Sequence, residues 1–76
     1  MEKQDFINLI LLEIESETKA SPGTELMELS EWDSLASMVT IGLIAEKFDI
    51  IVTAPQLRDC NTFEDILKLT SYDFSR

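Results

Sequence analysis

The stretch from Asp33 to Phe48 constrains the fold more than any other part of the chain. Its apolar residues recur every three or four positions, which places them on one face of an α-helix. The polar pair Asp33-Ser34 stands directly before this run. A short side chain with an oxygen accepts hydrogen bonds from the first free amides of a helix. The sequence therefore predicts a helix over residues 34–48, with Leu35 anchoring its start.

This helix is expected to turn one side to a core and the other side to solvent. The predicted inward side holds Met38, Ile41, Ile44, Ala45 and Phe48. The predicted outward side holds Ala36, Val39, Thr40, Leu43, Glu46 and Lys47. Val39 and Leu43 are four residues apart, so they would form an exposed apolar stripe beside Ser34. Gly42 has no Cβ, which weakens the helix slightly and permits close approach of a neighbour.

Three further helices are predicted, at residues 3–17, 54–60 and 62–72. The first has a stripe of apolar residues at helical spacing: Phe6, Ile7, Leu9, Ile10, Leu11 and Ile14. Thr53 and Thr62 are expected to cap the last two, and Thr62 with Asp65 has the spacing of a capping box. Residues 18–33 read as a long loop with Leu26, Met27 and Leu29 packed beneath it, and residues 73–76 as a frayed tail.

The 76 residues indicate a single domain, and its formal charge is −9. This charge argues against nucleic acid and anionic membrane surfaces as partners, and it favours proteins with basic patches. Acidity that only keeps a small protein soluble remains the alternative.

The chain has one cysteine and no histidine. Cys60 therefore has no partner for an internal disulfide, which fits a reducing compartment, and it is expected to be a small, partly buried apolar residue. A zinc site, a catalytic triad or any other enzyme site is disfavoured, and no metal ligands are predicted. With no segment that reads as a signal peptide or membrane span, a cytoplasmic monomer is expected.

At Asp33-Ser34-Leu35, and in the helical run that ends with Phe48-Asp49-Ile50, the chain resembles the acyl and peptidyl carrier proteins. The resemblance spans nearly the whole chain. It implies an all-α fold, an antiparallel four-helix bundle with three longer helices, a short third helix and a long first loop. It also implies that Ser34 receives a 4′-phosphopantetheine cofactor from coenzyme A, with Asp33 and Leu35 beside it and Asp33 orienting that reaction or its metal.

The resemblance further implies a set of protein partners. These are a phosphopantetheinyl transferase, a ligase that loads an acyl or aminoacyl group as a thioester, and a downstream acyltransferase or synthase. The residues expected to contact them are Trp32, Ala36, Val39, Leu43 and Glu46. Trp32 stands where the commonest family pattern has glycine, and it is expected to pin the loop to the helix start. The cargo stays open among fatty acids, amino acids, polyketide units and sugar-modifying acyl groups.

A second hypothesis needs no cofactor. A small acidic helical protein can act as a non-catalytic adaptor that binds a partner groove through the exposed face of its second helix. Attachment of phosphopantetheine to Ser34 is the property that distinguishes the two hypotheses.

Overall fold

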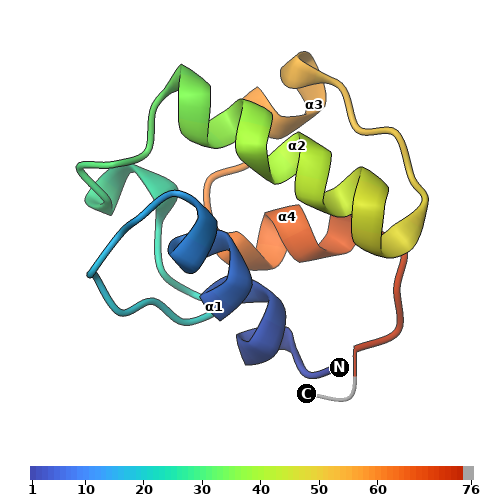
Figure 1. Cartoon of the computed structure of the whole chain (residues 1–76), viewed down its shortest axis with the longest axis horizontal. Coiled ribbons are helices and arrows are strands. Elements are labelled where there is room, and N and C mark those ends of the chain that lie inside the picture. The colour runs from blue at the N-terminus through green and yellow to red at the C-terminus, as the bar shows by residue number, and fades with distance from the viewer. Residues whose placement is uncertain (75–76) are drawn as a thin grey trace.

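The computed structural model describes residues 1–74, and within them the chain forms four α-helices and one 3₁₀ turn (Figure 1). The α-helices are α1 (Lys3–Glu13), α2 (Ser34–Phe48), α3 (Ala54–Arg58) and α4 (Phe63–Leu69), and the 3₁₀ turn η1 (Leu26–Glu28) lies in the loop after α1. The longest helix, α2, contacts both α1 and α3. The predicted all-α class is therefore confirmed, and α2 begins and ends where the sequence predicts.

The core joins the apolar faces of all four helices. From α1 it takes Phe6, Ile7, Ile10 and Leu11, as the spacing of these residues predicts. From α2 it takes Leu43 and Ile44, and from the later elements Val52, Leu57, Phe63, Ile66 and Leu67. Continuous burial of this kind is what stabilises a domain of this size.

The first helix ends at Glu13, earlier than the predicted residue 17. After the cap residue Ile14, Glu15 takes a left-handed conformation with φ of 57°. The amide of Glu15 donates to the carbonyl of Leu12 at 3.1 Å, and the amide of Ser16 donates to that of Leu11 at 2.9 Å. These two bonds form a Schellman motif, which stops the helix although no glycine is present to mark the position.

The long loop after α1 is tied to the start of α4 by backbone hydrogen bonds. The amide of Leu26 donates to the carbonyl of Asn61 at 2.8 Å, and the amide of Phe63 donates to that of Thr24 at 3.2 Å. Leu26 and Leu29 are buried beneath the loop as predicted. Met27 is exposed, so the prediction that it packs there is wrong, because η1 turns its side chain outward between the two leucines.

The last two helices begin at the predicted caps. The hydroxyl of Thr53 accepts from the amide of Gln56 at 3.4 Å, and the hydroxyl of Thr62 accepts from the amide of Asp65 at 3.3 Å. Both caps are completed as capping boxes.

Both of these helices end before the predicted residues. α3 stops at Arg58 and α4 at Leu69. Past α4, Ser71 has a positive φ of 59°. The hydroxyl of buried Thr70 donates to the carbonyl of Leu67 at 2.7 Å and accepts from the amide of Tyr72 at 3.1 Å. This hydroxyl thus bonds backbone groups on both sides of the helix end.

An aromatic cluster closes one end of the core. Phe48, at the end of α2, has its ring centroid 5.0 Å from that of Phe6, 5.0 Å from that of Tyr72 and 5.7 Å from that of Phe74. The predicted frayed tail is therefore wrong at Phe74, which is half-buried against the core. Ser75 and Arg76, the rest of that predicted tail, lie outside the described residues.

Within residues 1–74, no helix combines the length and the apolar character needed to cross a membrane.

Candidate functional site

The candidate site lies at the N-terminus of α2. Asp33 is the cap residue, with extended backbone angles of −139° and −168°, and its Oδ1 accepts from the amide of Ala36 at 2.9 Å. Ser34 is the first residue of the helix, and its side chain is exposed. Leu35 is 69% exposed, so the prediction that it anchors the helix start in the core is wrong. The cap therefore fixes the backbone of this turn and leaves Ser34 open to solvent.

The predicted division of α2 into inward and outward sides is wrong at several positions. Ala36 and Leu43, two of the expected partner contacts, are 3% and 8% exposed, and Thr40 is fully buried. Val39, the third, is half-buried against the core. Met38, expected in the core, is 68% exposed. Ala36 and Leu43 consequently belong to the interior and Val39 is only half-buried, so the three do not form an exposed docking stripe.

This difference arises because α2 is apolar around most of its circumference, so its periodicity does not select one face. The contacts of α2 with α1 and α3 decide which of its faces is buried. Thr40 enters the core without an unsatisfied group, because its hydroxyl donates to the carbonyl of Ala36 at 2.9 Å. Gly42 is exposed, and a Cβ added there would meet no heavy atom within 4 Å, so no neighbour approaches it.

A groove of about 430 Å³ opens beside Ser34, between the loop, α2 and α3. Ser34, Ser37 and Met38 line it from α2, and Leu57 and Arg58 line it from α3. Ile41 of α2 and Ala54 of α3 also line it, and the loop and neighbouring segments contribute Leu26, Met27, Trp32, Asp33 and Cys60. Its volume falls in the range of small-molecule sites, roughly 300–1,000 Å³.

The opposite side of the α2 N-terminus has a different electrostatic character. A smaller depression of about 260 Å³ lies there, and Leu35 contributes to its wall. It is lined by four carboxylates, those of Glu13, Glu15, Glu31 and Asp33. Glu31 is half-buried and its Oε1 accepts from the Ser16 hydroxyl at 3.1 Å. The start of α2 therefore separates an acidic depression from a groove that contains an arginine.

Trp32 is half-buried, and its ring centroid lies 6.2 Å from that of Phe63, so the indole joins the loop to α4. The prediction that it pins the loop to the start of α2 stays a prediction. Cys60 is the groove residue that behaves as the sequence predicts. Cys60 is half-buried and packs against the core. Burial raises the pKa of its thiol, as do the nearby carboxylates of Asp65 and Asp59. The thiol is therefore mainly protonated at neutral pH and a weak nucleophile.

Glu46, another expected partner contact, is exposed and lies within 3.7 Å of the Lys47 ammonium. It lies twelve residues after Ser34, roughly 18 Å along the helix axis. Contact with a protein bound at Ser34 is therefore possible for Glu46 only if that protein covers most of α2.

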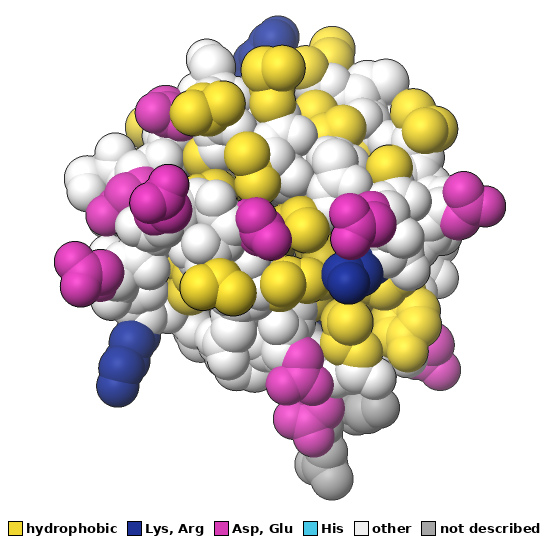
Figure 2. Space-filling view, in the orientation of Figure 1, with side chains coloured by type: hydrophobic (Ala, Val, Ile, Leu, Met, Phe, Trp, Pro, Cys, Tyr) yellow, Lys and Arg dark blue, Asp and Glu magenta, His cyan; other side chains and the backbone are white. Residues whose placement is uncertain are grey.

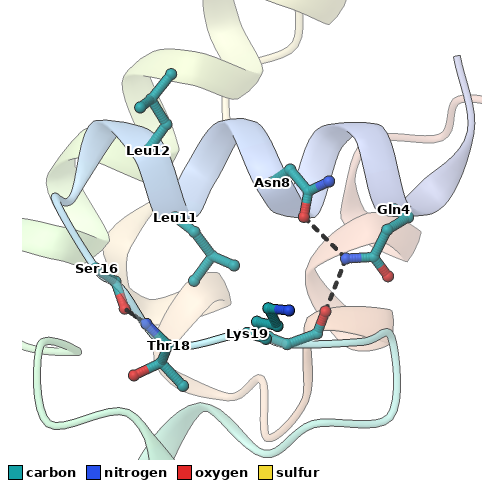
Figure 3. Close-up of a pocket in the computed structure, with 8 residues that line it drawn as sticks. Gln4, Asn8, Leu11, Leu12, Ser16, Thr18 and Lys19 are labelled. Atoms are coloured by element: carbon teal, nitrogen blue, oxygen red, sulfur yellow. Dashed lines mark hydrogen bonds between the residues drawn. The ribbon is translucent and has the colours of Figure 1, made fainter.

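Another cleft lies away from Ser34, between α1 and the loop that follows it (Figure 3). The amide nitrogen of Gln4 donates to Asn8 Oδ1 at 3.0 Å and to the carbonyl of Ala20 at 2.7 Å. The volume of this cleft, about 490 Å³, exceeds that of the Ser34 groove. We nevertheless assign the site to the Ser34 groove. The larger cleft has no lining residue in common with that groove, and the amide of Gln4 in it already joins α1 to the loop.

The surface around these sites is mixed in character. The face shown in Figure 2 has apolar side chains interspersed with many acidic and few basic ones. Three exposed apolar side chains lie close to Ser34 in sequence or in the groove: Met27, Leu35 and Met38. Among residues 1–74, no group of three or more Cys, Asp or Glu side chains is placed to hold a metal ion. Comparison of the chain with protein-family models, with curated proteins and with solved structures gives no match.

Proposed function

We propose that the protein is an acyl carrier, which tethers acyl or aminoacyl intermediates on a 4′-phosphopantetheine arm at Ser34 for a discrete biosynthetic pathway. The observation that carries this proposal is the exposed hydroxyl of Ser34 at the first position of α2, beside the Asp33 cap and at the edge of a groove. The antiparallel four-helix bundle of carrier proteins, cytoplasmic location and a monomeric state are part of the same proposal.

Attachment of the arm is a phosphoryl transfer from coenzyme A. The Ser34 oxygen forms a bond to the phosphorus that bears pantetheine, the bond between the two phosphates breaks, and adenosine 3′,5′-bisphosphate leaves. We assign acceptance of the serine proton to a base on the transferase, because this chain has no histidine to take it at neutral pH. Ser34 thus needs accessibility more than intrinsic reactivity, and its exposure meets that need.

The residues around Ser34 fit a group of this chemistry. The groove offers volume for a small-molecule arm, apolar walls from Met38 and Leu57, and a cation from Arg58. When attached, the arm supplies a terminal thiol that holds the cargo as a thioester. The protein itself performs no chemistry on the cargo, and it raises the local concentration of the cargo at successive enzymes.

Enzymes that act at Ser34 meet a different surface from the one predicted. We place their contact on Leu35 and Met38, the exposed apolar residues next to Ser34, in place of buried Ala36 and Leu43. Leu35→Ser should lower kcat/KM for modification of Ser34 by a transferase. Ile51→Ser is the matched control, since Ile51 is equally apolar and 81% exposed but lies beyond the far end of α2. An equal effect of both changes would contradict this placement.

The proposed function is tested by mass. The purified chain is incubated with coenzyme A, magnesium and a broad-specificity phosphopantetheinyl transferase, and the intact mass is measured. The wild-type chain should gain one phosphopantetheine group and Ser34→Ala none. Ser37→Ala is the matched control, because Ser37 lines the same groove one turn further along α2, and it should be modified like the wild type. An unmodified wild-type chain beside a modified reference carrier would refute the proposal.

The second candidate is a non-catalytic adaptor that binds a partner through α2. The exposed apolar pair Leu35 and Met38 favours it, since exposed apolar side chains near one another mark protein contacts. An adaptor would bind its partner equally well with serine or alanine at position 34. The mass experiment therefore separates the two candidates.

A further inference from the structure

Most of the sulfur in the chain borders the groove beside Ser34. The chain has three methionines and one cysteine. Three of these four residues, Met27, Met38 and Cys60, line the groove of about 430 Å³, and Met1 does not. They come from three separate parts of the fold: Met27 from η1, Met38 from α2, and Cys60 from the segment just after α3. Sulfur atoms that are distant in sequence are thus brought to the walls of one small space.

The two methionine side chains are free to move, whereas the cysteine is held by its turn. Met27 is 85% and Met38 68% exposed, so neither thioether is needed to fill the core. The amide of Cys60 donates to the carbonyl of Leu57 at 3.0 Å, and its thiol donates to the carbonyl of Gln56 at 3.6 Å. A thiol is a weak donor, so this second bond is easily replaced by a stronger interaction. The groove therefore combines a positioned thiol with two flexible thioethers that can move towards it.

We propose that this groove binds one Cu(I) ion through the sulfur atoms of Met27, Met38 and Cys60. Thiolate and thioether sulfur are soft ligands, which suit Cu(I) and not the ions that prefer oxygen. As the bond from Cys60 to the ion forms, its S–H bond breaks and the proton passes to the buffer. The single negative charge of the thiolate then balances the single positive charge of the ion.

The other residues of the groove leave the choice of ion to the sulfur atoms. One carboxylate and one guanidinium line it, those of Asp33 and Arg58, so their formal charges cancel. Zn(II) takes nitrogen, thiolate and carboxylate ligands in place of thioethers, and among residues 1–74 no group of three Cys, Asp or Glu side chains is placed to hold it. The ion needs no contribution from Ser34, so this proposal does not rest on the carrier function.

The site is tested by NMR with Ag(I), which shares the preference of Cu(I) for sulfur and undergoes no redox change, in a chloride-free buffer. The protein is labelled with ¹³C at its methionine methyl groups. One equivalent of Ag(I) should shift the signals of Met27 and Met38 and leave that of Met1, the internal control, in place. Ile51→Met is the matched control, because it adds an exposed thioether outside the groove, and its signal should also stay in place. One equivalent of Zn(II) should shift none of these signals.

Affinity supplies a second readout. Cu(I) is titrated in competition with a chelator in the absence of oxygen. Met27→Leu and Met38→Leu, which nearly conserve volume, should each weaken the affinity by at least about tenfold, since even the loss of an outer-shell partner costs about that much. Unshifted signals of Met27 and Met38, or an unchanged affinity in both leucine variants, would leave Cys60 as the only ligand and overturn the proposal. A shift of the Met1 signal equal to theirs would show that Ag(I) binds any thioether of the chain, and this result would overturn it as well.

Discussion

Replacement of Asp33 separates the structural role of this residue from its proposed role in the modification of Ser34. Asp33→Ala deletes the acceptor of the 2.9 Å bond from the Ala36 amide and leaves a helix-terminal donor without its cap. Loss of an N-cap costs about 1 kcal/mol, within a range of roughly 0.5–2. Against a total stability of roughly 4–11 kcal/mol for 76 residues, this is a measurable fraction. The unfolding midpoint should fall by about 4–8 °C for each kcal/mol lost.

Asp33→Asn is the matched variant, because asparagine caps a helix about as well as aspartate. Thermal and urea unfolding of wild type, Asp33→Ala and Asp33→Asn are compared by circular dichroism at about 0.5 M salt. At this ionic strength the interaction of the Asp33 charge with the helix dipole is largely screened. The asparagine variant should retain more than half of the stability that alanine loses. Equal losses in the two variants would refute the capping argument.

The same pair of variants defines what the proposed transferase requires of Asp33. If Asp33 acts only by holding the first turn of α2, Asp33→Asn should be modified at the wild-type rate. If the carboxylate orients the reaction or its metal, both variants should be modified slowly, although only Asp33→Ala is destabilised. Initial rates measured well below the unfolding midpoint of each variant decide between these roles.

Four other substitutions test the packing and the helix ends. Gly42→Ala should raise the free energy of unfolding by about 0.5–1 kcal/mol, because the site is exposed, helical and open to a Cβ; unchanged stability would contradict this. Thr70→Val should lower the free energy of unfolding by about 1–2 kcal/mol, since the Thr70 hydroxyl bonds two backbone groups. Thr40→Val should be near neutral in urea unfolding, because the Thr40 hydroxyl bonds only one. A larger loss in Thr40→Val than in Thr70→Val would be inconsistent with these hydrogen bonds. Backbone hydrogen bonds from the amides of Asn61 and Thr62 lower the pKa of Asp65, so its contribution to stability is present above its ordinary pKa and is lost as the pH falls through the lowered value. Unfolding midpoints measured down to about pH 3 should therefore decline less in Asp65→Asn than in wild type. Parallel curves would contradict this.

Helix starts could be predicted from the sequence because they depend on local chemistry. Asp33, Thr53 and Thr62 each combine a short oxygen-bearing side chain with a following helical pattern, and all three are caps in the structure. The buried stripe of α1 could be predicted for a similar reason, since mostly polar residues occupy its other faces, with Leu12 as an exposed apolar exception. Local signals of this kind also located Ser34 at the first position of α2.

The inward face of α2 could not be predicted, because almost every side of this helix carries apolar residues. Met38 and Leu43 are both suitable core residues, and only the tertiary contacts of α2 with α1 and α3 decide between them. A helix end without glycine, as at Glu15, leaves no local sequence signal either. Phe74 was missed because its burial depends on a cluster contributed by α1 and α2, far from it in sequence.

The backbone bonds between the long loop and the start of α4 bear on the order of events when the chain is translated and folds. The carbonyl of Thr24 is paired with the amide of Phe63, a residue that the ribosome adds 39 steps later (63 − 24). Contacts between segments so far apart form late in folding, since the intervening chain must first be closed into a loop. A nascent chain in which Ser34 has left the ribosome but Phe63 has not still lacks the backbone bond that holds the loop leading to Ser34. If Ser34 is modified as proposed, a transferase that requires this loop in its folded position would act only after Phe63 has left the ribosome.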